Sequence, residues 1–262
     1  MSWNQILTLI AFSAAPLIAQ SEQPHQAPKA PKSVRIYVFD CGSLGSGLAV
    51  PCYLIAHPKG TLMWDVGLTA DSELKPGAKN KPLAAQLAAV GYAPGDITYL
   101  AFSHYHSDHT ANANLFAKST WLVSKAERDI MFSDPPRPRF VEIKTYSALK
   151  DSKTTILPAT SDYDVFGDGT VIIKPTPGHT PGHLVVLVKL AKTGPVVIGG
   201  DLYSEQKDRD SNKVSEYDSN GEQLLASRAK IEAFLKTSGA QLWIEHDGAT
   251  FAKLKKAPEF YE

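Results

Sequence analysis

Several short segments of the chain have the hydrophobic pattern of β-strands, and the first of them alternates with the period of two that is typical of a strand. The first segment, residues 34–39, reads Val-Arg-Ile-Tyr-Val-Phe. Two further strands, at 50–56 and 61–65, flank the turn at 57–60. Short apolar segments predict the remaining strands, at 97–102, 120–123, 155–157, 170–174, 184–190, 196–198 and 241–244.

Helical patterns lie between these strands. Residues 82–90 are rich in Ala and Leu and stop at Gly91, a residue type that commonly follows the last turn of a helix. The other predicted helices lie at 110–116, 124–131, 221–237 and 249–255. Two polar segments, 134–139 and 204–220, are predicted to be surface loops. Strands interleaved with helices indicate layered α and β structure, without giving the topology.

The N-terminus has the pattern of an export signal. Residues 6–19 are apolar but too few to span a bilayer, and Ala19 is a small residue suited to a cleavage site. We therefore expect a signal peptide over 1–20, a Pro-rich linker over 21–33 and a single domain over 34–262, in the periplasm or outside the cell. Residues 1–5 lack Lys and Arg, so an unstructured or membrane-associating segment is the alternative.

Composition and charge narrow the choice of partners. The chain has 27 Lys and Arg against 27 Asp and Glu, and a nucleic-acid-binding protein usually has a basic excess. We expect no nucleic-acid partner and no stable membrane span. The only two cysteines, Cys41 and Cys52, flank a glycine-rich turn. A disulfide is one interpretation, and two small buried thiols is the one we prefer. His25 and His57 are expected at the surface.

The segment 103–110, Ser-His-Tyr-His-Ser-Asp-His-Thr, has four candidate metal ligands within six residues. His104 and His106 are two apart, so on extended backbone they point to the same side. Asp108 and His109 follow and can face a second position. Imidazole and carboxylate are the usual nitrogen and oxygen ligands of borderline divalent metals.

Three more candidates follow apolar strands elsewhere in the chain. His179 comes after the strand at 170–174, Asp201 after 196–198 and His246 after 241–244. Scaffolds commonly place functional groups at strand ends. We predict two adjacent metal sites, and the alternative is a histidine-rich surface turn with no ligands.

This ligand pattern resembles the metallo-β-lactamase superfamily over residues 34–262. The resemblance implies an α+β fold, a four-layer αββα sandwich with the metal site at one edge of its sheets. It implies that His104, His106 and His179 bind one metal, that Asp108, His109 and His246 bind the other, and that Asp201 bridges both. Common β-lactamases of this type have Cys where Asp201 stands, so the pattern argues against that activity.

Within the superfamily the chain is most similar to the N-acyl-homoserine-lactone lactonases, on the stretches 34–42, 51–55, 60–67 and 178–183. The resemblance places a substrate-binding tyrosine three residues after the bridging aspartate. Here that position is Ser204, and Tyr203 precedes it. A shift by one residue reverses the side chain on extended backbone. Tyr203 is therefore a candidate substrate donor or a buried tyrosine. The segment 42–50 is also shorter than the corresponding loop of many relatives.

The predicted reaction is lactone ring opening by a hydroxide that two cations share. One cation polarises the carbonyl, the other takes up the leaving alkoxide, and Asp108 passes a proton to it. Zinc is the expected metal, with iron, manganese or cobalt as alternatives. Other ester, phosphotriester or thioester substrates remain open, as do a non-catalytic metal-binding role and the oligomeric state, where a dimer is possible.

Supporting roles are also predicted around the metal pair. Asp65 is a candidate acceptor for a ligand imidazole, with an ordinary turn aspartate as the alternative. His183 is predicted to be structural. Phe132, Phe140 and Tyr146 are candidate walls for an acyl group, or part of the core.

Overall fold

The computed structural model describes residue 1 and residues 25–45, 47–135 and 138–262. The predicted signal over 1–20 lies outside the described residues except for Met1, as do residues 21–24 of the predicted linker. From residue 25 to residue 33 the chain forms no helix or strand. Among the described residues, no helix has the length and hydropathy that crossing a bilayer requires.

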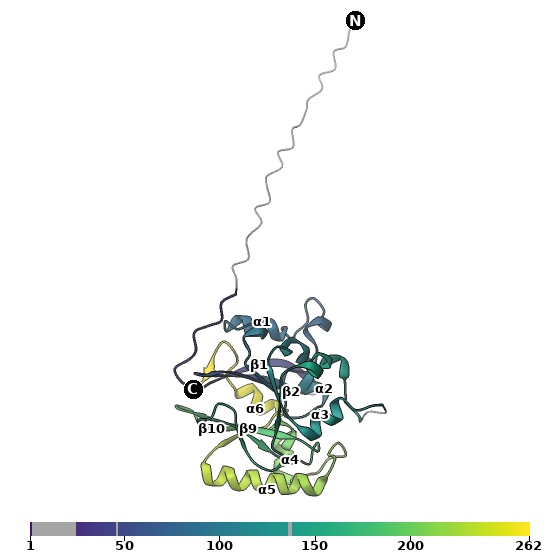
Figure 1. Cartoon of the computed structure of the whole chain (residues 1–262), viewed down its shortest axis with the longest axis vertical. Coiled ribbons are helices and arrows are strands. Elements are labelled where there is room, and N and C mark those ends of the chain that lie inside the picture. The colour runs from purple at the N-terminus through teal and green to yellow at the C-terminus, as the bar shows by residue number, and fades with distance from the viewer. Residues whose placement is uncertain (2–24, 46, 136–137) are drawn as a thin grey trace.

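Two β-sheets face each other, and helices cover their outer faces (Figure 1). The larger sheet has the order β12-β1-β2-β3-β4-β5-β6, and the smaller has the order β11-β10-β9-β8-β7. The strands of the larger sheet are β1 (Arg35–Leu44), β2 (Leu48–His57), β3 (Gly60–Trp64), β4 (Tyr99–Ala101), β5 (Thr120–Ser124), β6 (Thr154–Leu157) and β12 (Phe260–Tyr261). Those of the smaller sheet are β7 (Tyr163–Asp164), β8 (Val171–Pro175), β9 (Leu184–Leu190), β10 (Gly194–Ile198) and β11 (Gln241–Trp243).

The helices are distributed over both outer faces and the sheet edges. The α-helices are α1 (Leu83–Ala89), α2 (Ser107–Thr110), α3 (Lys125–Met131), α4 (Gln206–Ser211), α5 (Gly221–Ser238) and α6 (Gly248–Lys253). The described residues also form short 3₁₀ helices: η1 (Asp71–Glu73), η2 (Pro94–Asp96), η3 (Ala113–Phe116), η4 (Ile143–Thr145), η5 (Ser147–Asp151) and η6 (Gly200–Leu202).

The alternation along β1 shows how the sequence pattern produces the layers. Phe39 packs on the outer side with Leu87 of α1, whereas Val38 packs between the sheets with Val186 of β9. Successive side chains of a strand point to opposite faces, so both faces of this sheet become buried. On the far side, α5 packs Ile231 and its neighbours against the outer face of β9. The four-layer α+β arrangement expected from the sequence is confirmed.

The elements differ from the sequence prediction in several places. The predicted loop 204–220 contains α4, which lacks apolar periodicity and begins where the Asp208 carboxylate accepts from the Glu205 amide. The predicted helix 110–116 is divided into α2 and η3. Strands β7 and β12 are two residues each, too short for a period of two to reveal.

Two predictions about single residues are wrong. Cys41 and Cys52 form a disulfide, because the antiparallel pairing of β1 and β2 brings their Cα atoms to 5.9 Å. The sequence could not show this strand register. His57 is 2% exposed rather than at the surface, because its ring stacks on Phe166 at 4.1 Å between centroids.

Candidate metal centre

The segment after β4 carries the first four candidate ligands. His104 and His106 lie in the segment between β4 and α2, and Asp108 and His109 lie in the single turn of α2. The Ser103 amide, directly before them, donates to Oδ1 of Asp65 at 2.7 Å. This bond ties the start of the ligand segment to the end of β3.

The other three candidates come from the smaller sheet. His179 follows β8, Asp201 lies in η6 directly after β10, and His246 follows β11. Gly200 has a φ of +48°, and a Cβ there would lie 2.5 Å from Cβ of Ser103. Glycine therefore allows the Asp201 turn to pack directly on the segment that follows β4.

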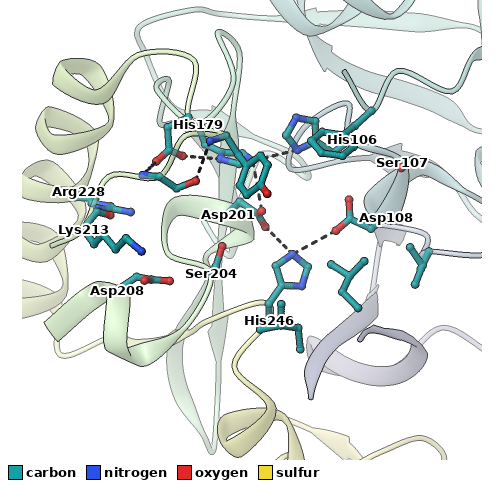
Figure 2. Close-up of a pocket in the computed structure, with 17 residues that line it drawn as sticks. His106, Ser107, Asp108, His179, Asp201, Ser204, Asp208, Lys213, Arg228 and His246 are labelled. Carbon is teal, nitrogen blue, oxygen red and sulfur yellow. Dashed lines mark hydrogen bonds and ion pairs between the residues drawn. The ribbon is translucent and has the colours of Figure 1, made fainter. Parts of the chain in front are cut away.

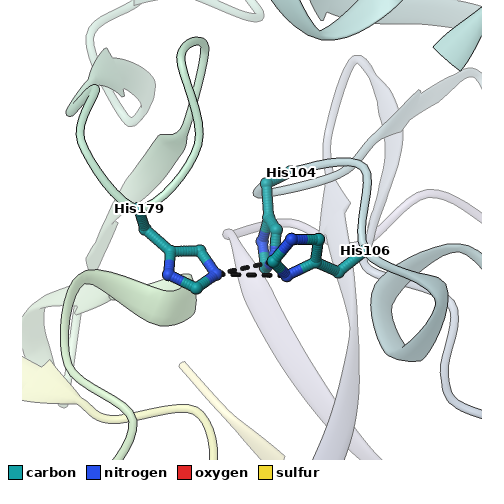
Figure 3. A group of neighbouring side chains, drawn as sticks. All are labelled: His104, His106 and His179. Carbon is teal, nitrogen blue, oxygen red and sulfur yellow. Dashed lines mark hydrogen bonds between the residues drawn. The ribbon is translucent and has the colours of Figure 1, made fainter. Parts of the chain in front are cut away.

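The structure brings three imidazoles together in one group (Figure 3). Nε2 of His179 lies 3.2 Å from Nε2 of His104 and 3.2 Å from Nδ1 of His106. Tetrahedral ligands about 2.0–2.1 Å from a zinc ion lie about 3.3 Å from one another. The spacing of these nitrogens fits a divalent cation.

A second group forms beside the first (Figure 2). Oδ2 of Asp108 lies 3.4 Å from Nε2 of His246 and 3.6 Å from Nε2 of His109. Asp201 lies between the groups: its Oδ1 is 3.1 Å from Nε2 of His246, and its Oδ2 is 3.4 Å from Nε2 of His179. All seven predicted ligands thus converge, with Asp201 facing both groups.

Three buried polar atoms at this point have no hydrogen-bond partner among the described residues: Nε2 of His109, Nε2 of His246 and Oδ1 of Asp201. Unpaired buried polar atoms are costly, and their grouping at one point is typical of a site where they bind cations. Nitrogen and carboxylate donors in this number suit zinc and similar cations. The residues fit two divalent ions.

Hydrogen bonds on the outer side of three of the rings fix which nitrogen faces the centre. Nδ1 of His246 lies 2.7 Å from the Ala49 carbonyl, and Nδ1 of His179 lies 2.8 Å from Oδ1 of Asp218. Nδ1 of His109 lies 3.1 Å from Oδ2 of Asp65. Such contacts orient metal-binding imidazoles and hold the required tautomer.

Burial and neighbouring charges shift the pKa values of these groups in different directions. Burial lowers the pKa of His104 well below its usual value and that of His106 to about 2, so both are neutral, the form that binds metal. Burial also opposes the charged form of His246, but the Asp201 carboxylate outweighs it and raises the pKa to about 9. The surrounding imidazoles keep the pKa of Asp201 low despite its burial.

A model of the metallo-beta-lactamase superfamily matches residues 45–232. The chain belongs to this superfamily. The family resemblance and the fold class predicted from the sequence are confirmed.

Named relatives align with this chain over most of its length and most of their own. The chain is 27% identical over 260 residues to the N-acyl homoserine lactonase AttM of Azorhizobium caulinodans, covering 87% of this chain and 99% of that protein. It is 26% identical over 236 residues to an N-acyl homoserine lactonase of a Bacillus species, covering 81% and 87%.

Solved structures show the same superfamily fold. A quorum-quenching N-acyl homoserine lactone hydrolase superimposes with a TM-score of 0.74 at 22% identity, covering 87% of this chain and 98% of that one. A dizinc quorum-quenching lactonase, AidC, superimposes with a TM-score of 0.60 at 18% identity, covering 82% and 79%.

The centre of this metallo-beta-lactamase domain opens into a cavity of about 330 Å³. One wall is apolar and includes Leu44, Leu48 and Leu68. Another wall of the cavity is polar. It includes Asp208, Lys213 and Arg228, which Figure 2 shows on the side of the cavity away from Asp108. Of the three predicted aromatic walls only Phe140 lines the cavity, with its ring 5.0 Å from that of His106.

Tyr203 does not lie in this cavity, so its placement does not support the predicted role as a substrate donor. Its ring is 3% exposed and packs beneath the Arg228 guanidinium at 4.4 Å, and burial raises its pKa to about 12. Ser204, the next residue, lines the cavity instead. The one-residue shift therefore has the expected consequence of reversing the side chain.

The predicted supporting residues lie next to the ligands. Asp65 accepts from His109, and Nε2 of His183 accepts from the Asp201 amide at 3.0 Å. His183 also lies 2.9 Å from Oγ1 of Thr176 through its Nδ1 atom, and burial lowers its pKa to about 3. This neutral ring positions the Asp201 backbone.

Sequence reasoning missed two carboxylates, Asp218 and Glu127. Asp218 orients His179, and Glu127 accepts from amides of two ligand-bearing loops. Asp218 lies in the polar segment predicted to be a loop, where nothing distinguishes it from its acidic neighbours. Glu127 lies in a helix pattern, where only its burial would have marked it.

Proposed function

We propose that the protein is a lactonase that opens N-acyl homoserine lactones at a centre of two divalent cations, with zinc as the expected metal. The observation that carries this proposal is the pair of ligand groups with Asp201 between them, at a cavity with an apolar wall and a polar wall. The names of the relatives, which the chain matches over most of their length, support the substrate class.

The cavity suits a small ring with an acyl chain. Burial of an alkyl chain against Leu44, Leu48 and Leu68 is favourable by about 0.8 kcal/mol per CH₂. Ser204, Asp208 and Lys213 offer a hydroxyl, a carboxylate and an ammonium, which together can bond an amide's N–H and C=O. A lactone with an amide and an alkyl chain contains all the groups that these walls complement.

The residues around the centre have separate roles in the proposed reaction. The imidazoles, Asp108 and Asp201 would hold the cations, which when bound supply Lewis acidity and a hydroxide nucleophile at neutral pH. Asp108 lines the cavity as well as facing His246, so its carboxylate can carry a proton to the leaving alkoxide. Phe140, packed on His106, excludes water from that side of the centre.

The test combines metal analysis with a substrate panel. We expect two equivalents of zinc per chain and opening of N-acyl homoserine lactones in preference to aryl esters, phosphotriesters and thioesters. Asp108→Asn is expected to lower kcat strongly while metal is retained. Preference for another ester class would replace the substrate assignment, and full metal uptake without turnover on any substrate would indicate a binding protein.

We also propose that the protein is exported. The Cys41–Cys52 disulfide supports this, because disulfides persist in oxidising compartments. Fractionation of the source cells tests it: recovery in the periplasm or medium, with residues 1–20 removed, is the expected result. Recovery of the full-length chain from the cytoplasm would contradict export.

A further inference from the structure

Glu127 is a buried carboxylate that lies outside both ligand groups. It is 2% exposed, in the first turn of α3. Its Oε2 accepts from the Tyr105 amide at 2.8 Å, and its Oε1 accepts from the Gly182 amide at 2.8 Å. Burial of a carboxylate is costly unless it is well bonded. Both oxygens here are bonded to backbone of other segments.

These two amides belong to the two loops that hold one ligand group. Tyr105 lies between His104 and His106, and Gly182 lies three residues after His179. One carboxylate therefore links the two halves of the three-histidine group. The second group is held differently, because His109 bonds to Asp65 and His246 bonds to the Ala49 carbonyl.

The start of α3 is a rigid support for this link. The Ser124 hydroxyl caps the helix by accepting from the Glu127 amide at 3.2 Å. A Cβ on Gly182 would lie 2.0 Å from Oγ of Ser124, so the His179 loop packs directly on this helix end. Glu127 thus has little freedom to move, and neither has the loop beside it.

We propose that Glu127 is a positioning residue that holds the His104–His106 segment and the His179 loop at the spacing that the three-histidine cation site requires. Contacts outside the ligands that fix their geometry in advance strengthen metal binding. Loss of Glu127 therefore weakens the three-histidine site selectively and leaves the site of Asp108, His109 and His246 nearly unchanged. The inference rests on the proposed metal centre but not on the substrate.

The experiment measures each site alone. His246→Ala retains the three-histidine site, and His106→Ala retains the other. Apo-proteins of both are titrated with Zn²⁺ in competition with a chromophoric chelator, with and without Glu127→Ala. We expect Glu127→Ala to lower zinc affinity about 10- to 100-fold in the His246→Ala background and less than about twofold in the His106→Ala background.

Two further variants control the result. Glu142→Ala removes an exposed carboxylate and is expected to change neither site. Glu127→Gln keeps one acceptor oxygen and is expected to weaken the three-histidine site by an intermediate amount; it replaces Glu127→Ala if circular dichroism shows that variant to be unfolded. Equal losses at both sites, or no loss at either, would overturn the inference. Selective loss of zinc affinity at the three-histidine site, in a protein that opens no lactone, would support the role of Glu127 and contradict the proposed substrate.

Discussion

Nδ1 of His179 lies 2.8 Å from Oδ1 of Asp218, and the two residues are 39 positions apart in the chain. The other oxygen of Asp218 accepts from the Ser215 amide at 2.6 Å, and the Ser219 amide donates to the His179 carbonyl at 2.9 Å. The segment before α5 therefore contacts His179 at both its imidazole ring and its backbone carbonyl. The cavity wall and the metal centre share this segment.

We predict that Asp218→Ala lowers zinc affinity and lactone turnover about 10- to 100-fold, because the His179 ring loses the acceptor that orients it. Zinc titration and kcat/KM measure the two effects. Asp151→Ala, at an exposed aspartate, is the matched control and should change neither. Unchanged zinc affinity in Asp218→Ala would show that the hydrogen bond is dispensable.

Lys213 is predicted to contribute to substrate binding. Its exposed side chain lines the cavity, and its ammonium has no hydrogen bond or ion pair within the described part of the chain. Lys213→Met should raise KM for an N-acyl homoserine lactone about three- to tenfold with little change in kcat, because an interaction made equally in ground and transition states affects binding.

A plain lactone of equal chain length, which lacks the amide, should respond little to the same change. Lys230→Met, at an exposed position of α5 away from the cavity, serves as the control. Equal effects of Lys213→Met on both lactones would show that Lys213 does not bind the amide of the substrate.

The disulfide is predicted to stabilise the fold. Its cysteines are 11 residues apart, and closing a loop of this length contributes about 3 kcal/mol through the unfolded chain. The double variant Cys41→Ser, Cys52→Ser should lose about this free energy of unfolding, measured in urea. Reductant should destabilise the wild type and leave the variant unaffected, and equal sensitivity of both proteins to reductant would contradict the prediction.

His57 is predicted to make stability fall on the acid side. Burial lowers its pKa in the folded protein below the usual 6.5, although Asp168 opposes this effect. Below about pH 6.5 the unfolded chain takes up a proton that the folded chain resists, so the free energy of unfolding decreases as the pH falls.

His57→Gln removes this titration. Urea unfolding of both proteins between about pH 7 and 5 should show a shallower decrease for the variant than for the wild type. Identical pH profiles would mean that His57 takes up its proton equally in both states.

Much of the fold could be predicted from local patterns. Once β1 is recognised as a strand, its period of two assigns Val38 and Phe39 to opposite faces of the sheet. The ligands could be predicted for a related reason. His104 and His106 are two apart at the end of an apolar strand, and His179, Asp201 and His246 repeat that position after other strands.

Only the tertiary structure decided what surrounds those ligands. Asp218 and Glu127 contact loops that are distant in sequence, and no local period marks a carboxylate that accepts from a remote amide or ring. The side on which Tyr203 lies, the pairing of Cys41 with Cys52 and the burial of His57 all depend on strand register and on what packs above each residue. The order of the residues determines the period of each strand and the position of each candidate ligand at a strand end. Hydrogen-bond partners and burial are determined only when segments distant in sequence pack together.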